Sequence, residues 1–391
     1  MANTLLTSTK VTREILRVAH EKATFIATTD MSYDDQYAVT GAKIGSALKI
    51  RLPNKYTVRT GKTLAPQDTA EESVTLTLAT QKGVDMNFST AELTLDLDDF
   101  SKRIIQPATS VLVSTLESDY ISYVTPKVWN AVGTAGTTPA SMLVFGQARA
   151  KLNQNLAPKD DNRSVQINSD AMASMVNAYS ALFHDQMEIK RQYRDGFISR
   201  NSGFDWYENE RIWTITTGSD HTTVTVNDAA IADGDTTLTT AGGSVEQGTV
   251  FTIAGVNAVH PETKADLGFL QQFTVTADAT TAWTFTPAYY ASGPKQNVTA
   301  LPVTAAAIVL VGSASTSYEQ HLAYHKDAFA FVTADLEMPQ GVHFASRQNF
   351  EGLSIRVVRQ YDINNDNIPA RLDILHGYEA IRPEWAVRIT G

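Results

Sequence analysis

The sequence predicts an α+β fold into which a separate all-β domain is inserted. One observation is a change of composition over residues 217–317, which contain 20 threonines, 8 acidic residues and only two lysines, Lys264 and Lys295. Another is that no arginine occurs between Arg211 and Arg347, whereas the segments on either side use arginine normally and mix helical with strand-like patterns. The arrangement that fits both is an all-β domain within a larger α+β domain.

The inserted segment alternates apolar residues with threonine in several short runs. These runs begin at His221, Val250, Phe273 and Trp283, and turn-forming residues separate them. β-branched residues with a period of two, bounded by turns, are typical of antiparallel strands. Several such strands in one short segment predict a small barrel or sandwich.

The segment before the insertion carries the strongest helical pattern. Apolar residues recur in steps of four over 98–128 and predict a long helix, which Asp98 and Asp99 would cap. Pro107 suits the first turn of a helical segment, and Pro126 should kink or end the helix. The remaining patterns predict a weak amphipathic helix within 11–27, a helix over 170–186, and strands at 352–360 and 370–376.

Residues 36–99 are divided by charge. The first part, 36–67, has six basic residues and no acidic one, whereas 68–99 has eight acidic residues against the single Lys82. Residues 74–78 alternate like a strand. The segment therefore predicts a long extended hairpin with one basic limb and one acidic limb.

Composition limits what the chain can bind. Its 391 residues are 43% apolar, which is enough for a large core and for two or three domains of ~150 residues. A formal net charge of −10 disfavours a general role in wrapping nucleic acid. Cysteine is absent, which excludes disulfides and thiolate sites, and the N-terminus is too polar for a signal peptide. We therefore expect a protein made in the cytoplasm, with no membrane partner.

Three short motifs imitate known sites, and each lacks an essential part. Residues 61–63, Gly-Lys-Thr, end like a phosphate-binding loop, but Tyr56 replaces its first glycine and no helix is predicted to follow. His321 and His325 have the spacing of zinc ligands but no predicted third ligand, so we interpret them as polar positions on a short helix. Residues 362–366 begin like a calcium loop without its glycine and closing glutamate. We expect no catalytic, cofactor or metal site.

The order of these parts resembles the coat proteins of short-tailed Salmonella-type temperate bacteriophages. The resemblance covers essentially the whole chain and includes the closing segments 318–331, 352–357 and 373–388, whereas 248–256 resembles the core strand of that family's inserted barrel. It implies the tailed-phage capsid fold. It divides the chain into an N-terminal arm (1–35), an extended loop (36–90), a peripheral domain with the spine helix (91–165), the first part of an axial domain (166–216), the inserted β-barrel (217–317) and a return through the axial and peripheral domains (318–391).

The resemblance also implies a function. The chain would be a major capsid protein that self-assembles into hexamers and pentamers of an icosahedral head, located in the virion and assembled in the host cytoplasm. Its implied partners are copies of itself, a scaffolding protein, a portal and packaged double-stranded DNA, which the inner face would contact without sequence specificity. In the family, a long acidic loop of the barrel bridges capsomers. The corresponding stretch here, 227–235, is short, so bridging through it is not predicted.

The charged limbs of 36–99 offer a physical means of assembly. Exposed ion pairs contribute only ~0–1 kcal/mol each, but a ring of subunits repeats each pair at every interface, which predicts salt-sensitive assembly. The alternative is that the two limbs pair within one hairpin. The proposed contacts join Lys49, Arg51, Arg59 and Lys62 of one subunit to acidic surface of the next, with Asp96, Asp98 and Asp99 as candidate partners.

Two other functions fit parts of the sequence. A threonine-rich β segment also suits a phage tail or adhesion protein with a carbohydrate-binding domain, but such fibres are usually repetitive and no internal repeat is found. An enzyme with an appended binding module is the third alternative. It is weakened because no catalytic constellation is recognised.

Overall fold

The computed structural model mixes helices with several β-sheets, as expected for the α+β class. The structure describes residues 15, 23–33, 47–64, 66–68, 71–89, 106–180, 200–342, 344–350, 353–363 and 367–391. The chain forms two compact units. The first comprises Met1–Ile50, Ser73–Tyr120 and Phe329–Ile381, and the second comprises Arg51–Glu72, Ile121–Ala328 and Arg382–Gly391.

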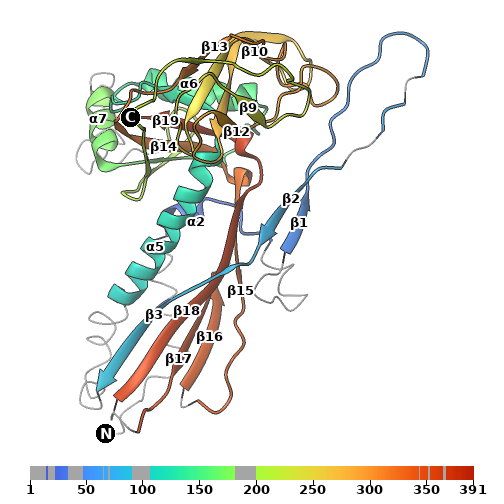
Figure 1. Cartoon of the computed structure of the whole chain (residues 1–391). Helices are drawn as coiled ribbons and strands as arrows, with labels where there is room; N and C mark the ends of the chain where they lie inside the picture. The colour runs from blue at the N-terminus through green and yellow to red at the C-terminus, as the bar shows by residue number, and fades with distance from the viewer. Residues whose placement is uncertain are drawn as a thin grey trace. The chain divides into compact units, whose positions relative to one another are not determined.

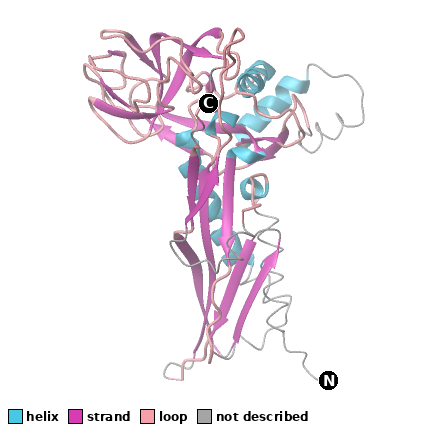
Figure 2. Cartoon of the chain, turned by 90° about the vertical axis from the view of Figure 1, so that its right-hand side faces the viewer, coloured by secondary structure: helices cyan, strands magenta, loops and turns pink. Residues whose placement is uncertain are grey.

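A five-stranded antiparallel sheet forms the first unit (Figures 1 and 2). Its longest strand, β18, pairs with β3, β15 and β17, and β17 pairs in turn with β16. The strands predicted at 352–360 and 370–376 correspond to β17 and to part of β18. The bounds are β3 (Thr80–Ser89), β15 (Phe329–Ala334), β16 (Phe344–Phe350), β17 (Leu353–Arg359) and β18 (Asn367–Ala380).

Helix α5 (Gln106–Val124) is the described part of the predicted long helix (Figure 1). Pro107 is the second residue of this described part. A 3-10 turn, η3 (Thr125–Lys127), follows and contains Pro126, so the helix ends where predicted. Residues 98–105 lie outside the described residues. No helix in the described part of the chain is long and apolar enough to cross a membrane.

Buried aromatic rings of the first unit meet at α5. The ring of Tyr120 lies 4.8 Å from that of Phe25 in the short helix α2 (Thr24–Ala27) and 5.5 Å from that of Phe331 in β15. One turn earlier, the buried carboxylate of Glu117 accepts a hydrogen bond of 2.6 Å from the backbone N–H of Phe25. The helix therefore fixes α2 through both apolar and polar contacts. Of the helix expected within 11–27, most residues lie outside the described part.

The second unit contains a mixed sheet in the order β4-β19-β14-β5-β6, with β7 also paired to β14. Helices α6 (Met142–Gln154) and α7 (Ser169–Ser180) supply side chains to its apolar core, and α7 is the described part of the helix predicted over 170–186. The strand bounds are β4 (Ala131–Gly133), β5 (Arg163–Ile167), β6 (Asp205–Glu208), β7 (Trp213–Thr216), β14 (Ser317–His325) and β19 (Ala386–Thr390).

The prediction that His321 and His325 lie on a short helix is wrong. Both are buried in strand β14, which pairs with β19 on one side and with β5 and β7 on the other. Pairing on both sides gives this backbone its hydrogen bonds, so the tertiary structure overrides the spacing of four that suggested a helix.

The second sheet of this unit is a six-stranded antiparallel barrel in the order β8-β13-β10-β11-β12-β9. A bridge between Val226 and Thr240, just beyond β8 and β9, joins the two ends and closes it. Aromatic residues fill the interior, including Phe251, Phe273 and Trp283. The strand bounds are β8 (Val224–Thr225), β9 (Thr237–Thr239), β10 (Val250–Val259), β11 (Asp266–Val275), β12 (Ala282–Thr286) and β13 (Ala307–Leu310).

The chain enters and leaves the barrel at one point. Strand β7 leads into it and β14 leads out, and these two strands pair with each other at Thr216 and Ser317. The next residues continue the pairing, because the N–H of Thr217 donates to the carbonyl of Thr316 at 3.0 Å. This geometry suits an inserted domain over 217–317, and we retain that boundary as a proposal.

Polar side chains connect the barrel to the mixed sheet. Gln272 of β11 uses its side-chain amide to bond both backbone groups of Ala131 in β4, at 3.0 and 2.9 Å. The fully buried Arg388 of β19 donates to the carbonyl of Gly248 at 2.6 Å and to the hydroxyl of Thr274 at 3.0 Å. Burial lowers the pKa of Arg388 to about 9. Directional hydrogen bonds of this kind orient the barrel on the sheet.

Candidate assembly surface

Strands β1 (Ala47–Arg51) and β2 (Ser73–Thr77) pair and form the base of a hairpin, and a long open loop connects them (Figure 1). The pairing extends one step into that loop, where the N–H of Leu52 donates to the carbonyl of Glu72 at 2.8 Å. The strand predicted at 74–78 corresponds to β2. We call residues 52–72 the hairpin loop; residues 65, 69 and 70 of it lie outside the described part.

Local hydrogen bonds shape the hairpin loop. The side chain of Gln67 bonds both backbone groups of Thr57 across the loop, at 2.9 and 2.6 Å. Gly61 has φ +103°, a left-handed conformation that favours glycine, and its carbonyl accepts from Arg59. The Gly-Lys-Thr sequence therefore forms a bend at the end of a loop, and the described residues that follow, 64, 66–68 and 71–77, contain no helix that would complete a phosphate site.

The end of the hairpin loop exposes large apolar side chains together with basic ones. Tyr56 is 57% exposed, Val58 97% and Leu64 78%. Arg59 and Lys62 are exposed beside them. Apolar side chains gathered on an exposed loop are typical of a surface that another chain covers.

The predicted contact residues divide into two groups. Arg51 already has a partner within the hairpin, since its guanidinium lies 3.4 Å from the carboxylate of Glu71. Lys49 is exposed on β1, and Arg59 and Lys62 are exposed on the loop. The candidate acidic partners, at positions 96, 98 and 99, lie outside the described residues.

Sequence reasoning missed a contact at the base of the loop. Lys295, in the loop after β12 of the barrel, forms an ion pair with Glu72 on the acidic limb. The two residues are far apart in the sequence, so no local pattern indicates the pair. The sequence did offer one signal, because Lys295 is one of only two lysines in 217–317. A lysine in a segment so poor in cations is a candidate for a specific ion pair.

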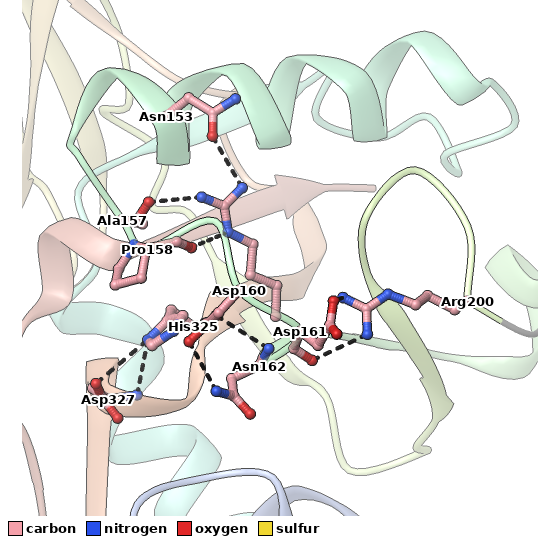
Figure 3. Close-up of polar contacts among 10 residues, drawn as sticks. Asn153, Ala157, Pro158, Asp160, Asp161, Asn162, Arg200, His325 and Asp327 are labelled. Carbon is pink, nitrogen blue, oxygen red and sulfur yellow. Dashed lines mark hydrogen bonds and ion pairs between the residues drawn. The ribbon is translucent and has the colours of Figure 1, made fainter.

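The polar cluster around His325 holds a turn in place (Figure 3). The N–H of Asp327 donates to Nδ1 of His325 at 3.2 Å, so Nε2 carries the proton and donates to Asp160 at 2.9 Å. Nearby, Arg163 donates to the carbonyls of Ala157 and Pro158, each at 2.8 Å. These bonds fix the turn between α6 and β5.

The remaining two motifs are His321, which lies within strand β14, and the calcium-like stretch that follows β17. His321 is fully buried, and burial lowers its pKa to about 4. In the calcium-like stretch, the N–H of Asp362 donates to the carbonyl of Asn367 at 2.9 Å, which closes a turn between β17 and β18. Residues 364–366 lie outside the described part.

A sequence model of the family described as "P22 coat protein - gene protein 5" matches residues 15–391. The chain belongs to the P22 coat protein family. The comparisons confirm the predicted α+β capsid fold and the predicted role as a major capsid protein, a structural component of the virion. None of the comparisons supports the tail or adhesion alternative.

Several solved structures are similar to this coat protein. A structure of Mycobacterium phage Che8 is 11% identical, covers 93% of this chain and 89% of its own, and gives a TM-score of 0.48. The capsid of cyanophage P-SCSP1u is 12% identical over 89% of this chain and 83% of its own, with a TM-score of 0.42. The CUS-3 coat protein I-domain is 30% identical over 25% of this chain and 100% of its own, with a TM-score of 0.20. No curated protein gives a significant match.

Proposed function

We propose that this coat protein builds the phage head by self-association into hexamers and pentamers of an icosahedral shell, without enzymatic activity. The observation that carries the proposal is the family match over residues 15–391. Copies with a net charge of −10 repel one another at long range, so specific local contacts have to bring them together. The hairpin loop supplies such contacts.

The apolar residues of the hairpin loop account for most of the affinity in this proposal. Burying a Val or Leu side chain contributes about 1.5–3 kcal/mol, whereas an exposed ion pair contributes ~0–1 kcal/mol. Val58 and Leu64 are therefore the stronger contributors once a neighbouring subunit covers them. The charges of Arg59 and Lys62 orient the contact and make it sensitive to salt.

The basic residues differ in how freely they can reach a neighbour. Arg59 and Lys62 are the leading candidates because Arg51 is already engaged by Glu71. Lys49 lies on the paired strand β1 and so has less reach. The proposed partners on the adjacent subunit remain Asp96, Asp98 and Asp99, which the sequence places on the acidic limb.

Further partners follow from the role of a head protein. A scaffolding protein and a portal would meet the assembling subunits in the host cytoplasm. Packaged double-stranded DNA would meet the inner face without sequence-specific binding, in keeping with the acidic composition of the chain. The inserted barrel over 217–317 would fold as a unit of its own and orient neighbouring parts of the subunit.

Charge reversal in the hairpin loop tests the proposal. The double variant Arg59→Glu/Lys62→Glu should lower shell yield strongly and weaken its dependence on salt, measured by light scattering and electron microscopy with and without a scaffolding partner. Lys159→Glu, at an exposed lysine of the turn after α6, is the matched control and should assemble normally. If the parent protein, the double variant and the control gave equal yield and equal salt dependence, Arg59 and Lys62 would not be part of the contact.

A further inference from the structure

The two lysines of the barrel segment meet at the loop after β12. Between 217 and 317 the chain has no other cation besides Lys264, Lys295 and its histidines. Lys264 donates to the carbonyls of Pro294 and Gln296, at 2.9 and 3.1 Å. Lys295 stands between those two carbonyls and points its ammonium at the hairpin.

The loop that carries Lys295 is fixed from several sides. The carboxylate of Asp233 accepts from the N–H of Ala291 at 2.7 Å and from the hydroxyl of Ser292 at 2.8 Å. The side chain of Asn297 accepts from the N–H of Tyr290 at 2.9 Å and donates to the carbonyl of Ala288 at 2.7 Å. With Lys264 holding the other end, the barrel presents Lys295 from a rigid support, so little conformational freedom remains to be lost on binding.

Lys295 reaches the hairpin at the rung where the loop begins. Its ammonium pairs with the carboxylate of Glu72, and it lies 5.7 Å from the ring centre of Tyr290. The hydrogen bond to Glu72 raises the pKa of Lys295, which keeps its charge in place. The backbone of Glu72 is itself bonded to Leu52, so holding this carboxylate holds both limbs of the hairpin.

A cleft lies beside the ion pair, between the hairpin loop and the barrel. It has a volume of about 240 Å³ and is lined on the hairpin side by Pro53, Asn54 and Lys55. Tyr290 and Pro294 line it on the barrel side. Because side chains do not fill the space between the two segments, packing alone leaves their angle free to vary, and the ion pair limits it.

We propose that Lys295 is a positioning residue for assembly, through which the inserted barrel sets the direction in which the hairpin loop is presented to the neighbouring subunit. The inference rests on the proposed function of that loop. Without the pair, the loop samples more directions, and fewer free subunits present it correctly for docking. The barrel therefore affects assembly indirectly, because it restricts the directions that the hairpin loop can adopt.

Charge exchange tests the pair directly. Lys295→Glu and Glu72→Lys should each slow assembly several-fold, and the double variant Lys295→Glu/Glu72→Lys should restore the rate because the pair is remade with its signs reversed. Lys295→Gln, which removes the charge with little change of size, should match the slow single variants. Lys159→Glu again serves as the control. Failure of the double variant to recover, with all variants melting like the parent protein, would overturn the proposal.

A cross-link tests where the pair forms. Because the chain contains no cysteine, Glu72→Cys/Lys295→Cys introduces the only two thiols, and a short bismaleimide, which replaces the length of the lost side chains, should link them within one chain of the unassembled subunit. Mixed single variants should not cross-link to each other. Chains that link only between subunits, or not at all, would contradict a contact within the free subunit.

The two proposals can fail separately. If Arg59→Glu/Lys62→Glu assembles normally, the contact role of the hairpin loop is wrong, whereas the bismaleimide cross-link in the free subunit still measures the Lys295–Glu72 contact. If that double variant fails to assemble while Lys295→Glu assembles at the parent rate, the loop is the contact and the positioning role of Lys295 is wrong.

Discussion

The carboxylate of Asp373 lies 2.7 Å from the guanidinium of Arg356, and the two residues face each other across adjacent strands β18 and β17. The Asp373 side chain is fully buried, whereas Arg356 retains a little exposure. Arg371 donates to the other oxygen of the same carboxylate at 3.0 Å. A buried charge with two cationic partners makes this point of the first unit sensitive to substitution.

Removing that carboxylate should destabilise the protein. Asp373→Ala leaves Arg356 without its counter-ion in a buried position, which costs about 3–5 kcal/mol for pairs of this kind. Denaturant unfolding measures the loss. Asp85→Asn is the matched control, since Asp85 is an exposed carboxylate 3.8 Å from Arg371, and it should change stability by less than about 0.5 kcal/mol. Equal effects from both variants would show that burial of Asp373 is unimportant.

Two glycine substitutions should act in opposite directions. Gly83 of β3 faces Asp373, and a Cβ there would lie 2.6 Å from the Asp373 carboxylate and 2.6 Å from the carbonyl of Leu372. Gly83→Ala should therefore cost about 1–3 kcal/mol through forced displacement of the strand. Gly146→Ala, inside α6 with no atom within 4 Å, should stabilise by about 0.5–1 kcal/mol. Thermal unfolding of both variants measures the two changes in stability. If both variants were stabilised, or both destabilised, the argument would be refuted.

Acid should destabilise the subunit through two buried histidines. Burial lowers the pKa of His321 and of His376 to about 4, from an ordinary value near 6.5. Unfolded chains then bind protons at a higher pH than folded ones, so stability is full above pH ~6.5 and falls as the pH drops toward 4. Each histidine should account for roughly 3 kcal/mol of this loss.

The variant that checks this assignment is His376→Leu. His376 stacks against Phe331 with ring centres 6.1 Å apart, so an apolar replacement keeps the packing and removes the protonation. Unfolding free energies at pH 7 and at pH 4.5 should differ less in the variant than in the parent protein. The same difference in both proteins would mean that other groups cause the acid sensitivity.

The segment 217–317 should fold by itself. Its barrel is closed by the bridge between Val226 and Thr240, has its own aromatic core, and begins and ends at paired backbone groups of Thr217 and Thr316. We expect the fragment expressed alone to melt cooperatively, with near-ultraviolet circular dichroism from its packed aromatic residues. A fragment without a cooperative transition would place the domain boundary elsewhere.

Local patterns in the sequence were sufficient to predict those helices and strands whose regularly spaced apolar residues face the core. Threonine alternation around Phe251 and Trp283 predicts barrel strands because those side chains point into one core while the threonines face outward. The apolar steps of four through Leu116 and Tyr120 predict α5 for the same reason. In each case one face of the element is buried and the other is not.

Other features depend on partners that no local pattern reveals. The spacing of His321 and His325 fits a helix face, but a strand paired on both sides buries them both. The Glu72–Lys295 pair joins residues from distant parts of the sequence, and its acidic member was interpreted only as part of a charged limb. Charge runs show that a surface is polar, whereas the partner of each charge is decided by the tertiary structure.

The hydrogen bond between Thr217 and Thr316 has a consequence for protein engineering. The two ends of the barrel segment lie one hydrogen bond apart, and the flanking strands β7 and β14 pair with each other. These strands can therefore stay paired at this junction whichever folded domain the chain carries between them. By the same geometry, an unrelated module with adjacent termini should be accepted there, which makes this junction a natural site for displaying foreign domains on a virus-like particle.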